Sequence, residues 1–254
     1  MKQRLDQAMF SRKLVGSRSE AESWIRLGKV IVDGEVRRKP GIFVSDSSKI
    51  ELKTEERYVS RAGLKLASVA GKFGVDFGGK VVLDVGSSTG GFTDYALQHG
   101  AAKVIAVDVG TDQLHPSLRT DPRIELHEKT DIRSVRCDHT EPREPQEIII
   151  EVPDIIVIDV SFVSLREILP HLFSFVLHPS SICLAMVKPQ FEATRAQLTK
   201  DGIVKNDRVR REIVQEFEQW ARQRFVILDK ADSEIAGSHG NRERFYVLQL
   251  PQKS

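Results

Sequence analysis

The stretch that decides the fold is Val81-Val-Leu-Asp-Val-Gly-Ser-Ser-Thr-Gly-Gly-Phe92. Its apolar beginning predicts a buried strand, and its glycine-rich turn leads into a helical pattern from Thr93. A dinucleotide-binding turn has the spacing G-x-G-x-x-G and a P-loop has Gly-Lys followed by Ser or Thr, and neither occurs here. What remains is an acidic residue at a strand end followed by a loose glycine turn, which suits a cationic cofactor without phosphate groups.

Apolar strands and helical segments alternate from residue 64 onward. This order is typical of a mostly parallel sheet with helices on both faces, so we expect a Rossmann-like α/β domain. The expected helices are 64–73, 93–100, 165–177 and 208–224, and the expected strands are 80–85, 103–109, 155–160, 182–187 and 245–250.

Aspartates follow three successive strands of this pattern. Asp84 ends the first and Asp108 ends the second, 24 residues later. Asp131 follows a third strand, which is expected between the second strand and residue 129 without exact bounds. S-adenosylmethionine has positive amino and sulfonium groups and a ribose diol that needs an acidic acceptor, so these carboxylates fit it. A single aspartate at a strand end is as often a helix cap or turn residue, but three in register favour the cofactor. The expected cofactor-binding residues are Asp84, Gly86, Ser88, Gly90, Gly91, Phe92, Asp108, Val109, Asp131 and Ile132.

The first 60 residues differ in charge from the rest of the chain. They contain 13 basic and 9 acidic side chains, whereas residues 61–254 contain 25 and 27. Helical spacing at 5–13, a capping box at Ser17-Arg-Ser-Glu20 and a hairpin turn at Asp33-Gly34 predict a small α/β fold. Its cations either belong to solvated faces or bind RNA phosphates; they are Arg4, Arg12, Lys13, Arg18, Arg26, Lys29, Arg37, Arg38 and Lys39.

Residues 2–53 resemble the S4 RNA-binding domain. The resemblance rests on the order of their elements and motifs: helix, arginine-containing turn, helix, glycine, Val-x-Val-x-Gly and Lys-Pro. The resemblance implies that this segment binds structured RNA, with Lys and Arg displacing counterions from phosphates. We therefore expect an S4-like domain at 1–53, a linker at 54–63 that contains the further RNA-contact candidate Arg61, and a cofactor-binding domain at 64–254.

If the cofactor is S-adenosylmethionine, the sequence also limits which kind of acceptor atom could be methylated. Methylation of base amino groups generally uses an (Asp/Asn)-Pro-Pro-(Tyr/Phe) loop, which is absent, and carbon-5 methylation needs a cysteine nucleophile. Cys183 lies in an apolar strand, and Cys137 has no supporting motif. The fourth and fifth strands instead lead into Asp159 and Lys188, at the sheet edge where ligands of parallel sheets bind. These two residues are a candidate acid/base pair.

Residues 55–250 resemble the FtsJ-type ribose 2′-O-methyltransferases. The matching stretches are Tyr58-Val-Ser-Arg-Ala-Gly-Leu-Lys65, the glycine turn with Thr93-Asp94, Val107-Asp-Val-Gly110, Ile158-Asp-Val-Ser-Phe162, Val187-Lys-Pro-Gln-Phe-Glu192 and Gly240-Asn-Arg-Glu243. Carried over by motif, the family's Lys-Asp-Lys-Glu tetrad is Lys65, Asp159, Lys188 and Glu243. Together with the S4-like segment, the chain is similar to the TlyA family of ribosomal RNA cytidine 2′-O-methyltransferases, also labelled haemolysin-like. One departure is Ser233-Glu-Ile, where that family usually has Ser-Pro-Ile.

A ribose 2′-hydroxyl is a poor nucleophile at neutral pH, so it must lose its proton as it attacks the methyl group. We expect Lys188 to orient or deprotonate this hydroxyl, with the pKa of Lys188 held down by Lys65 and by partial burial. Asp159 and Glu243 would offset the two lysine charges and fix their geometry. The alternative for these four residues is a structural ion-pair network.

The resemblance implies ribosomal RNA or a ribosomal subunit as the partner, and the short ends of the chain favour the large subunit. The chain has no secretory signal pattern and no apolar run of the length that spans a bilayer, so we expect a cytoplasmic protein without a membrane partner. Two cysteines without CxxC spacing offer no zinc site, and we expect no metal.

Three other functions stay open at this point. They are a non-catalytic RNA-binding or assembly factor, a membrane-lytic protein, and an NAD-dependent oxidoreductase, which the glycine spacing disfavours. The polar stretch 193–208, which carries Arg195, Lys200, Lys205 and Arg208, either touches RNA or is a solvated loop.

Overall fold

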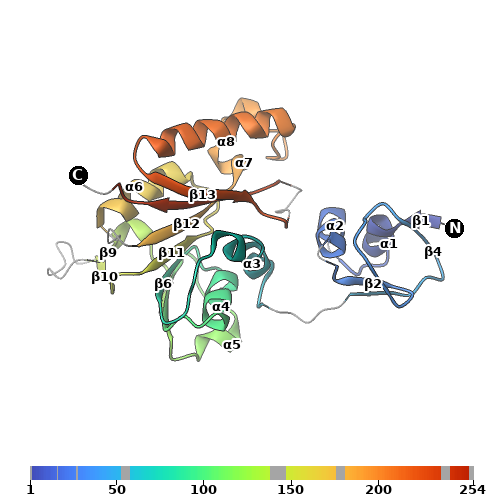
Figure 1. The fold of residues 1–254 in the computed structure, drawn as a ribbon, viewed down its shortest axis with the longest axis horizontal. Helices are drawn as coiled ribbons and strands as arrows, with labels where there is room; N and C mark the ends of the chain where they lie inside the picture. Colours follow the sequence, from blue (N-terminus) through green and yellow to red (C-terminus); the bar gives the residue numbers. More distant parts are fainter. Residues whose placement is uncertain are drawn as a thin grey trace. The chain divides into compact units, whose positions relative to one another are not determined.

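The structure is a computed structural model that describes residues 2–15, 17–26, 28–52, 58–137, 147–175, 181–235 and 241–251. The chain forms two compact units (Figure 1). The smaller unit comprises Met1–Arg57 and Glu234–Asn241, and the larger comprises Tyr58–Ser233 and Arg242–Ser254.

The smaller unit has two helices and five short strands among the described residues: β1 (Lys2–Arg4), α1 (Leu5–Ser11), α2 (Arg18–Arg26), β2 (Val30–Val32), β3 (Glu35–Arg37), β4 (Phe43–Ser45) and β5 (Ile50–Leu52). β1 pairs with β4, and β2 lies between β3 and β5, with every pair antiparallel. Leu5, Met9 and Ile25 are fully buried in its core. The predicted hairpin forms because Asp33 and Gly34 both have positive φ, as a tight two-residue turn requires.

The larger unit is built on a seven-stranded sheet. Its strands are β6 (Val81–Val85), β7 (Lys103–Val107), β8 (Ile124–His127), β11 (Ile155–Ile158), β12 (Ile182–Val187), β13 (Val226–Asp232) and β14 (Arg244–Gln249). The order is β13-β14-β12-β11-β6-β7-β8, in which only β14 runs antiparallel to its neighbours. β9 (Val135–Arg136) and β10 (Ile148–Ile149) form a separate parallel pair.

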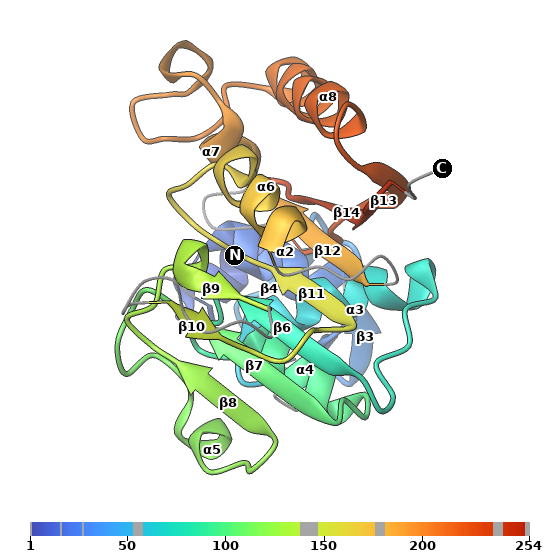
Figure 2. The ribbon, with the colours of Figure 1, turned by 90° about the vertical axis from the view of Figure 1, so that its left-hand side faces the viewer.

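Helices cover both faces of this sheet (Figure 1, Figure 2). On one face lie α6 (Leu165–Phe175) and α8 (Asp207–Arg222); on the other lie α3 (Arg61–Phe73), α4 (Gly91–Gln98) and α5 (Pro116–Arg119). Leu169 and Phe217 belong to the first core, and Leu66 and Tyr95 belong to the second. Shorter turns of helix are η1 (Ile132–Ser134), α7 (Pro189–Glu192) and η2 (Arg195–Gln197). The predicted Rossmann-like α/β fold is confirmed.

Several elements differ from the sequence expectation. α5, β9, β10 and β13 have no counterpart among the expected ranges, the strand at β8 is expected without exact bounds, and α3 begins earlier than expected. β13 is not predicted, because as an edge strand it is largely exposed and carries charged residues such as Asp229 and Lys230, so its sequence has no apolar alternation. Helix α3 begins at Arg61, three residues before the expected start, after Ser60 in an extended conformation. Arg61 therefore lies in a helix, and residues 54–57 of the expected linker lie outside the described residues.

Helices α3 and α4 approach each other closely at two glycines. A Cβ atom on Gly63 would lie 2.6 Å from the Cβ of Tyr58 and 2.8 Å from the carbonyl oxygen of Gly91. A Cβ atom on Gly91 would lie 2.7 Å from the backbone nitrogen of Gly63. Since backbone atoms cannot move aside as a side chain can, both positions require glycine.

We expect Gly63→Ala to lower the free energy of unfolding by about 1–3 kcal/mol, because the added methyl group overpacks this contact. Gly71→Ala is the matched control on the same helix, since nothing lies within 4 Å of its added Cβ. That variant should be stabilised by roughly 0.5–1 kcal/mol. Urea unfolding followed by circular dichroism measures both, and equal effects of the two substitutions would contradict the close approach.

Candidate active site

The four tetrad candidates meet because of strand register. Asp159 directly follows β11 and Lys188 directly follows β12, two adjacent parallel strands. Glu243 directly precedes β14, which runs antiparallel to β12 and pairs Arg244 with Val187. The end of one strand and the start of the other therefore lie at the same edge of the sheet.

Two ion pairs form at this edge. Lys188 Nζ lies 2.5 Å from Asp159 Oδ1, and Lys65 Nζ of α3 lies 2.7 Å from Glu243 Oε2. Burial raises the pKa of Glu243 above its usual range, although the positive charge of Lys65 and a hydrogen bond from it act in the opposite direction. Asp159 and Lys188 also act electrostatically on Glu243, so the four groups form one electrostatic unit. The structure brings together all four residues that the sequence singled out.

A cavity of about 440 Å³ opens beside this unit. It is lined by six of the ten expected cofactor residues, namely Gly86, Ser88, Asp108, Val109, Asp131 and Ile132. The other lining residues are Val85, Val107, Gln113, Thr130, Arg133, Asp159, Val160, Ser161, Phe162, Val163 and Ile168. Asp159 thus belongs both to the ion pairs and to the wall of the cavity.

The glycine turn shapes the cavity by bringing two loops into contact. Gly86 has a φ of +81°, and a Cβ atom there would lie 2.9 Å from the carbonyl oxygen of Asp159. Gly90, Gly91 and Phe92 do not line the cavity and instead pack the start of α4. Phe92 is 2% exposed, with its ring centroid 6.1 Å from that of Phe245.

Asp84 lies under the cavity wall rather than in it. Its side chain is buried, Thr93 Oγ1 donates a hydrogen bond of 2.7 Å to Oδ2, and Oδ1 has no hydrogen-bond partner among the described residues. Burial raises the pKa of Asp84 to about 7; the hydrogen bond from Thr93 opposes the shift and the charge of Asp159 adds to it. An unmet buried acceptor next to the cavity residues Val85 and Gly86 fits a cationic ligand.

Asp108 and Asp131 are held at the cavity by hydrogen bonds. Asp108 accepts from the backbone N–H groups of Ser88 at 2.8 Å and Gly110 at 2.7 Å. Asp131 accepts from the Arg133 guanidinium at 2.6 Å, and this hydrogen bond holds the pKa of Asp131 below its usual range. Two oriented carboxylates therefore border a largely apolar cavity, as a cationic nucleoside requires.

Sequence reasoning missed three residues of the surrounding loops. Ser161 accepts a hydrogen bond of 2.9 Å from Lys188 Nζ. Phe162 has a φ of +68° and a 91% exposed side chain, with its ring centroid 5.2 Å from that of Phe191. Glu192 accepts from Ser164 Oγ at 2.6 Å and from the backbone N–H of Leu165 at 2.7 Å. Their position directly after the two strand ends was the available signal.

These contacts tie the loop after β11 to the loop after β12. Glu192 caps the start of α6 from another segment of the chain, and burial raises the pKa of Glu192. The loop that carries Phe162 is therefore fixed at both ends, by Asp159 and by Leu165.

The RNA-contact candidates of the smaller unit divide into two groups. Five of them have partners within the unit. Arg4 and Arg18 bind the buried Asp6, and Arg12 donates hydrogen bonds to the carbonyl oxygens of residues 45, 46 and 48. Arg26 lies 3.9 Å from Glu22, and Arg37 pairs with Glu35. The others, Lys13, Lys29, Arg38 and Lys39, have no ion pair with any described residue. Arg61 is half-buried in α3.

Other chemistries find little support in the described part of the chain. Burial raises the pKa of the Cys137 thiol to about 12 and also raises that of Cys183, so neither is a ready thiolate nucleophile. The described residues contain no group of three or more His, Cys, Asp or Glu side chains arranged to hold a metal ion. None of the helices described here has the length and apolar character needed to cross a membrane.

Family comparison agrees with this site. The FtsJ-like methyltransferase family matches residues 58–250, and the S4 domain family matches residues 3–50. The chain belongs to the FtsJ-like methyltransferase family. It combines that domain with an N-terminal S4 domain, and the family indicates S-adenosylmethionine as the cofactor.

Relatives of this FtsJ-like methyltransferase match most of its length. The 16S/23S rRNA (cytidine-2′-O)-methyltransferase TlyA of Mycobacterium tuberculosis is 36% identical, over 97% of this chain and 89% of the relative. The 23S rRNA (cytidine-2′-O)-methyltransferase TlyA of Campylobacter jejuni is 36% identical, over 81% of this chain and 76% of the relative. A solved structure from Streptococcus thermophilus, described as a hemolysin, has a TM-score of 0.70 and 37% identity, over 99% of this chain and 90% of that one.

The raised pKa of Asp84 predicts a pH dependence of stability. Because the folded state binds the Asp84 proton more tightly than the unfolded state does, this contribution is largest at low pH and is lost as the pH rises through about 7. The Asp84→Asn variant lacks this pH-dependent contribution. The difference in unfolding free energy between wild type and Asp84→Asn should therefore fall by roughly 2–3 kcal/mol as the pH rises from 5 to 8.

Urea unfolding of the cofactor-free proteins at several pH values measures this difference. Asp112→Asn is the control, because the side chain of Asp112 is 86% exposed. A parallel pH profile for wild type and Asp84→Asn would show that Asp84 is ionised in the folded protein throughout this range.

Proposed function

We propose that this protein transfers a methyl group from S-adenosylmethionine to the 2′-hydroxyl of a cytidine in ribosomal RNA. The observation that carries the proposal is the pair of lysine–carboxylate contacts, at 2.5 and 2.7 Å, beside a cavity bordered by aspartates. Family membership supports the reaction class, and the names of the two TlyA relatives support cytidine in ribosomal RNA.

The cavity residues fit S-adenosylmethionine, which supplies a methyl group on a cationic sulfur. Asp108 would accept from the ribose diol, and Val109, Ile132 and Asp131 would border the adenine. The unpaired oxygen of Asp84 lies under the glycine turn and would stabilise the positive α-ammonium group of the cofactor. Gly86 and Ser88 would let the backbone approach the ligand.

The tetrad would act on the attacking hydroxyl. Lys188 has a fixed position because Asp159 and Ser161 both hold its ammonium group. From there it would orient the 2′-hydroxyl, and the Lys188–Asp159 pair would take up the hydroxyl proton as the oxygen–carbon bond forms and the carbon–sulfur bond breaks. The Lys65–Glu243 pair adds a second ammonium to the site without adding net charge.

The smaller unit would supply RNA affinity. Lys13, Lys29, Arg38 and Lys39 have no ion pair among the described residues, so they would neutralise phosphates without first breaking a contact within the protein. We place this S4 domain at 1–53, the linker at 54–63 and the methyltransferase domain at 64–254. Ribosomal RNA as substrate implies action in the cytoplasm.

The direct test is transfer of a tritiated methyl group to purified small subunits, large subunits and deproteinised ribosomal RNA, with mapping of the modified nucleotide. Wild type should label RNA at a ribose 2′-oxygen. Lys188→Ala should lower the rate by at least about a hundredfold, while calorimetry shows nearly unchanged cofactor affinity.

Lys72→Ala, at the last turn of α3, is the control and should keep wild-type activity. Label on protein only, or on no substrate, would refute the function and favour a non-catalytic RNA-binding factor. Normal activity of Lys188→Ala would instead refute the role of Lys188 alone.

We also propose that Phe162 stacks on the target base. A 91% exposed phenylalanine in a left-handed conformation is costly unless a ligand covers it, and Phe162 lines the cavity next to Ser161. Since stacking on an aromatic ring contributes about 1–3 kcal/mol per base, Phe162→Ala should lower kcat/KM for RNA by roughly 5- to 150-fold.

Phe162→Tyr keeps the ring and should retain most of the activity. Cofactor affinity, measured by calorimetry, should be the same in both variants. If Phe162→Ala and Phe162→Tyr have equal kcat/KM values, the ring does not contact the base.

A further inference from the structure

The segment 193–211 stands out from the rest of the larger unit by its charge. It contains six basic and two acidic residues, a net charge of +4. The remainder of residues 61–254 contains 19 basic and 25 acidic residues, a net charge of −6. The net negative charge of the remainder repels RNA, whereas the positive charge of this segment attracts it.

This segment consists of a hydrogen-bonded hairpin and the first residues of α8. Thr194 and Gln197 form a reciprocal capping box around η2. Leu198 and Val204 form a β-bridge, and Thr199 donates its backbone N–H to Ile203 at 2.8 Å. The cations of the segment are therefore displayed from defined backbone positions. We call residues 193–211 the basic hairpin.

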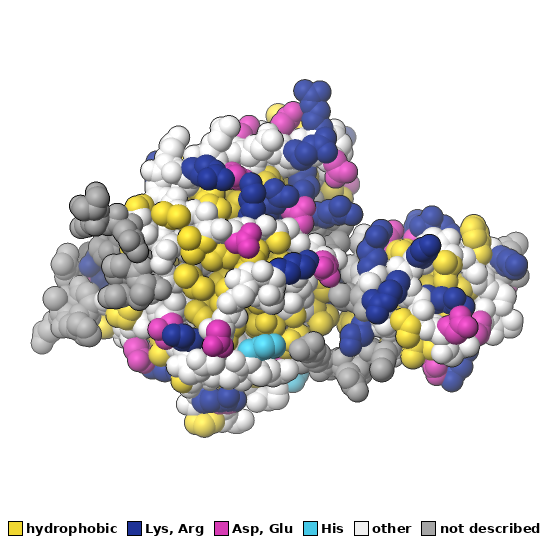
Figure 3. Space-filling view, viewed as in Figure 1, with side chains coloured by type: hydrophobic (Ala, Val, Ile, Leu, Met, Phe, Trp, Pro, Cys, Tyr) yellow, Lys and Arg dark blue, Asp and Glu magenta, His cyan; other side chains and the backbone are white. Residues whose placement is uncertain are grey.

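Four cations of the basic hairpin have no ion pair with any described residue: Arg195, Lys200, Lys205 and Arg211. All four side chains are exposed. The other two are paired, Arg208 with Glu212 at 3.0 Å and Arg210 with Asp232 at 2.8 Å. In Figure 3, Lys and Arg side chains gather over the region of α7 and α8.

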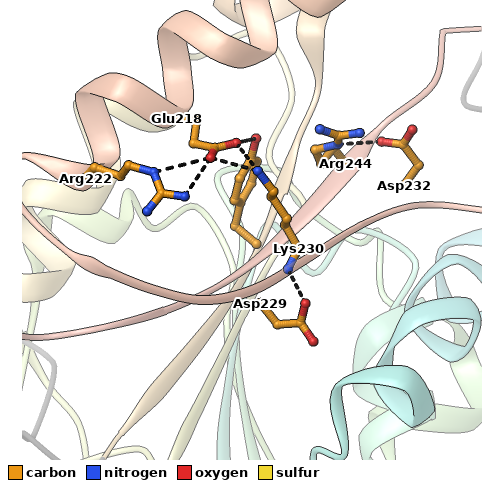
Figure 4. Close-up of polar contacts among 7 residues, drawn as sticks. Glu218, Arg222, Asp229, Lys230, Asp232 and Arg244 are labelled. Carbon is orange, nitrogen blue, oxygen red and sulfur yellow. Dashed lines mark hydrogen bonds and ion pairs between the residues drawn. The ribbon is translucent and has the colours of Figure 1, made fainter.

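Cations farther along α8 and on the strands beside it behave differently. Figure 4 shows Arg222 and Lys230 both bound to Glu218, and Arg244 bound to Asp232. Those charges are neutralised within the protein. An unpaired cation needs no internal contact to be broken before it binds a phosphate, so the basic hairpin is the part of this surface best suited to an anionic partner.

The basic hairpin follows directly from the active-site loop. Lys188 directly follows β12, α7 comes next, and the hairpin begins at residue 193. Glu192, the last residue of α7, is bonded to Ser164 and Leu165, and the Phe191 ring lies beside Phe162. These contacts anchor the base of the hairpin to the loop that borders the cavity.

We propose that Arg195, Lys200, Lys205 and Arg211 form a second RNA-binding surface, on the methyltransferase domain itself, that contacts backbone phosphates flanking the target nucleotide. The inference rests on the proposed function, since it takes ribosomal RNA as the substrate. The S4 domain would hold the RNA at one place, and the basic hairpin would hold the strand that enters the active site.

The test compares two fourfold variants of the full-length protein. The first is Arg195→Gln/Lys200→Gln/Lys205→Gln/Arg211→Gln. The second removes the same charge at the opposite edge of the sheet, where the strands begin, through Lys72→Gln/Lys80→Gln/Arg123→Gln/Arg224→Gln. Binding to deproteinised ribosomal RNA and to isolated subunits is measured between 50 and 250 mM salt.

The hairpin variant should bind deproteinised RNA at least tenfold more weakly at about 0.1 M salt, and the slope of log K against log salt should become shallower by about 3. Its KM for RNA should rise while its cofactor affinity stays the same. The opposite-edge variant should match wild type in all of these quantities.

Equal losses in both variants, or an unchanged salt slope in the hairpin variant, would overturn the proposal. A loss seen only with intact subunits, and not with deproteinised RNA, would also overturn it in favour of an acidic protein partner. Failure of the proposed function gives a different result, namely RNA binding by wild type without methyl transfer to any RNA.

Discussion

The ion pair between Lys188 and Asp159 is the interaction on which the site depends. Two charged groups at the edge of an apolar core are stable only when each offsets the desolvation of the other. Here that condition is met by strand register, since β11 and β12 are adjacent and parallel and Ile158, the last residue of β11, pairs with Ala185, three residues before Lys188. β14 runs the opposite way, which brings Glu243 to the same edge and gives Lys65 its partner. Removing any one of the four groups leaves another charge without its partner.

The cofactor and the RNA require opposite charges on the protein. A cationic cofactor is best held by carboxylates, and Asp108, Asp131 and Asp159 all border the cavity. RNA is an anion, and a domain that collects carboxylates repels it. Cations without an ion pair among the described residues are found instead in the S4 domain, at Lys13, Lys29, Arg38 and Lys39, and in the basic hairpin, at Arg195, Lys200, Lys205 and Arg211. The net charge of +2 for the whole chain hides this division.

Close backbone contacts and buried polar groups hold the loops of the site in place. Gly86 allows the glycine turn to touch the backbone of Asp159, and Glu192 joins the loop after β12 to the start of α6. Both contacts link segments that are far apart in the sequence. They explain why an exposed ring such as Phe162 can be held in a left-handed conformation at the cavity, and why the basic hairpin starts from a fixed base.

The sequence by itself determined the α/β fold, the glycine turn, the S4 domain and the four residues of the two ion pairs, because periodicity, spacing and family motifs are local properties of the chain. It did not separate cofactor candidates that line the cavity, such as Asp108, from those that pack beneath it, such as Asp84 and Phe92. It also missed β13, Phe162 and Glu192, and it left the basic hairpin undecided. Burial, exposure and the presence of an ion-pair partner depend on which distant segments meet, and only the tertiary structure decides that.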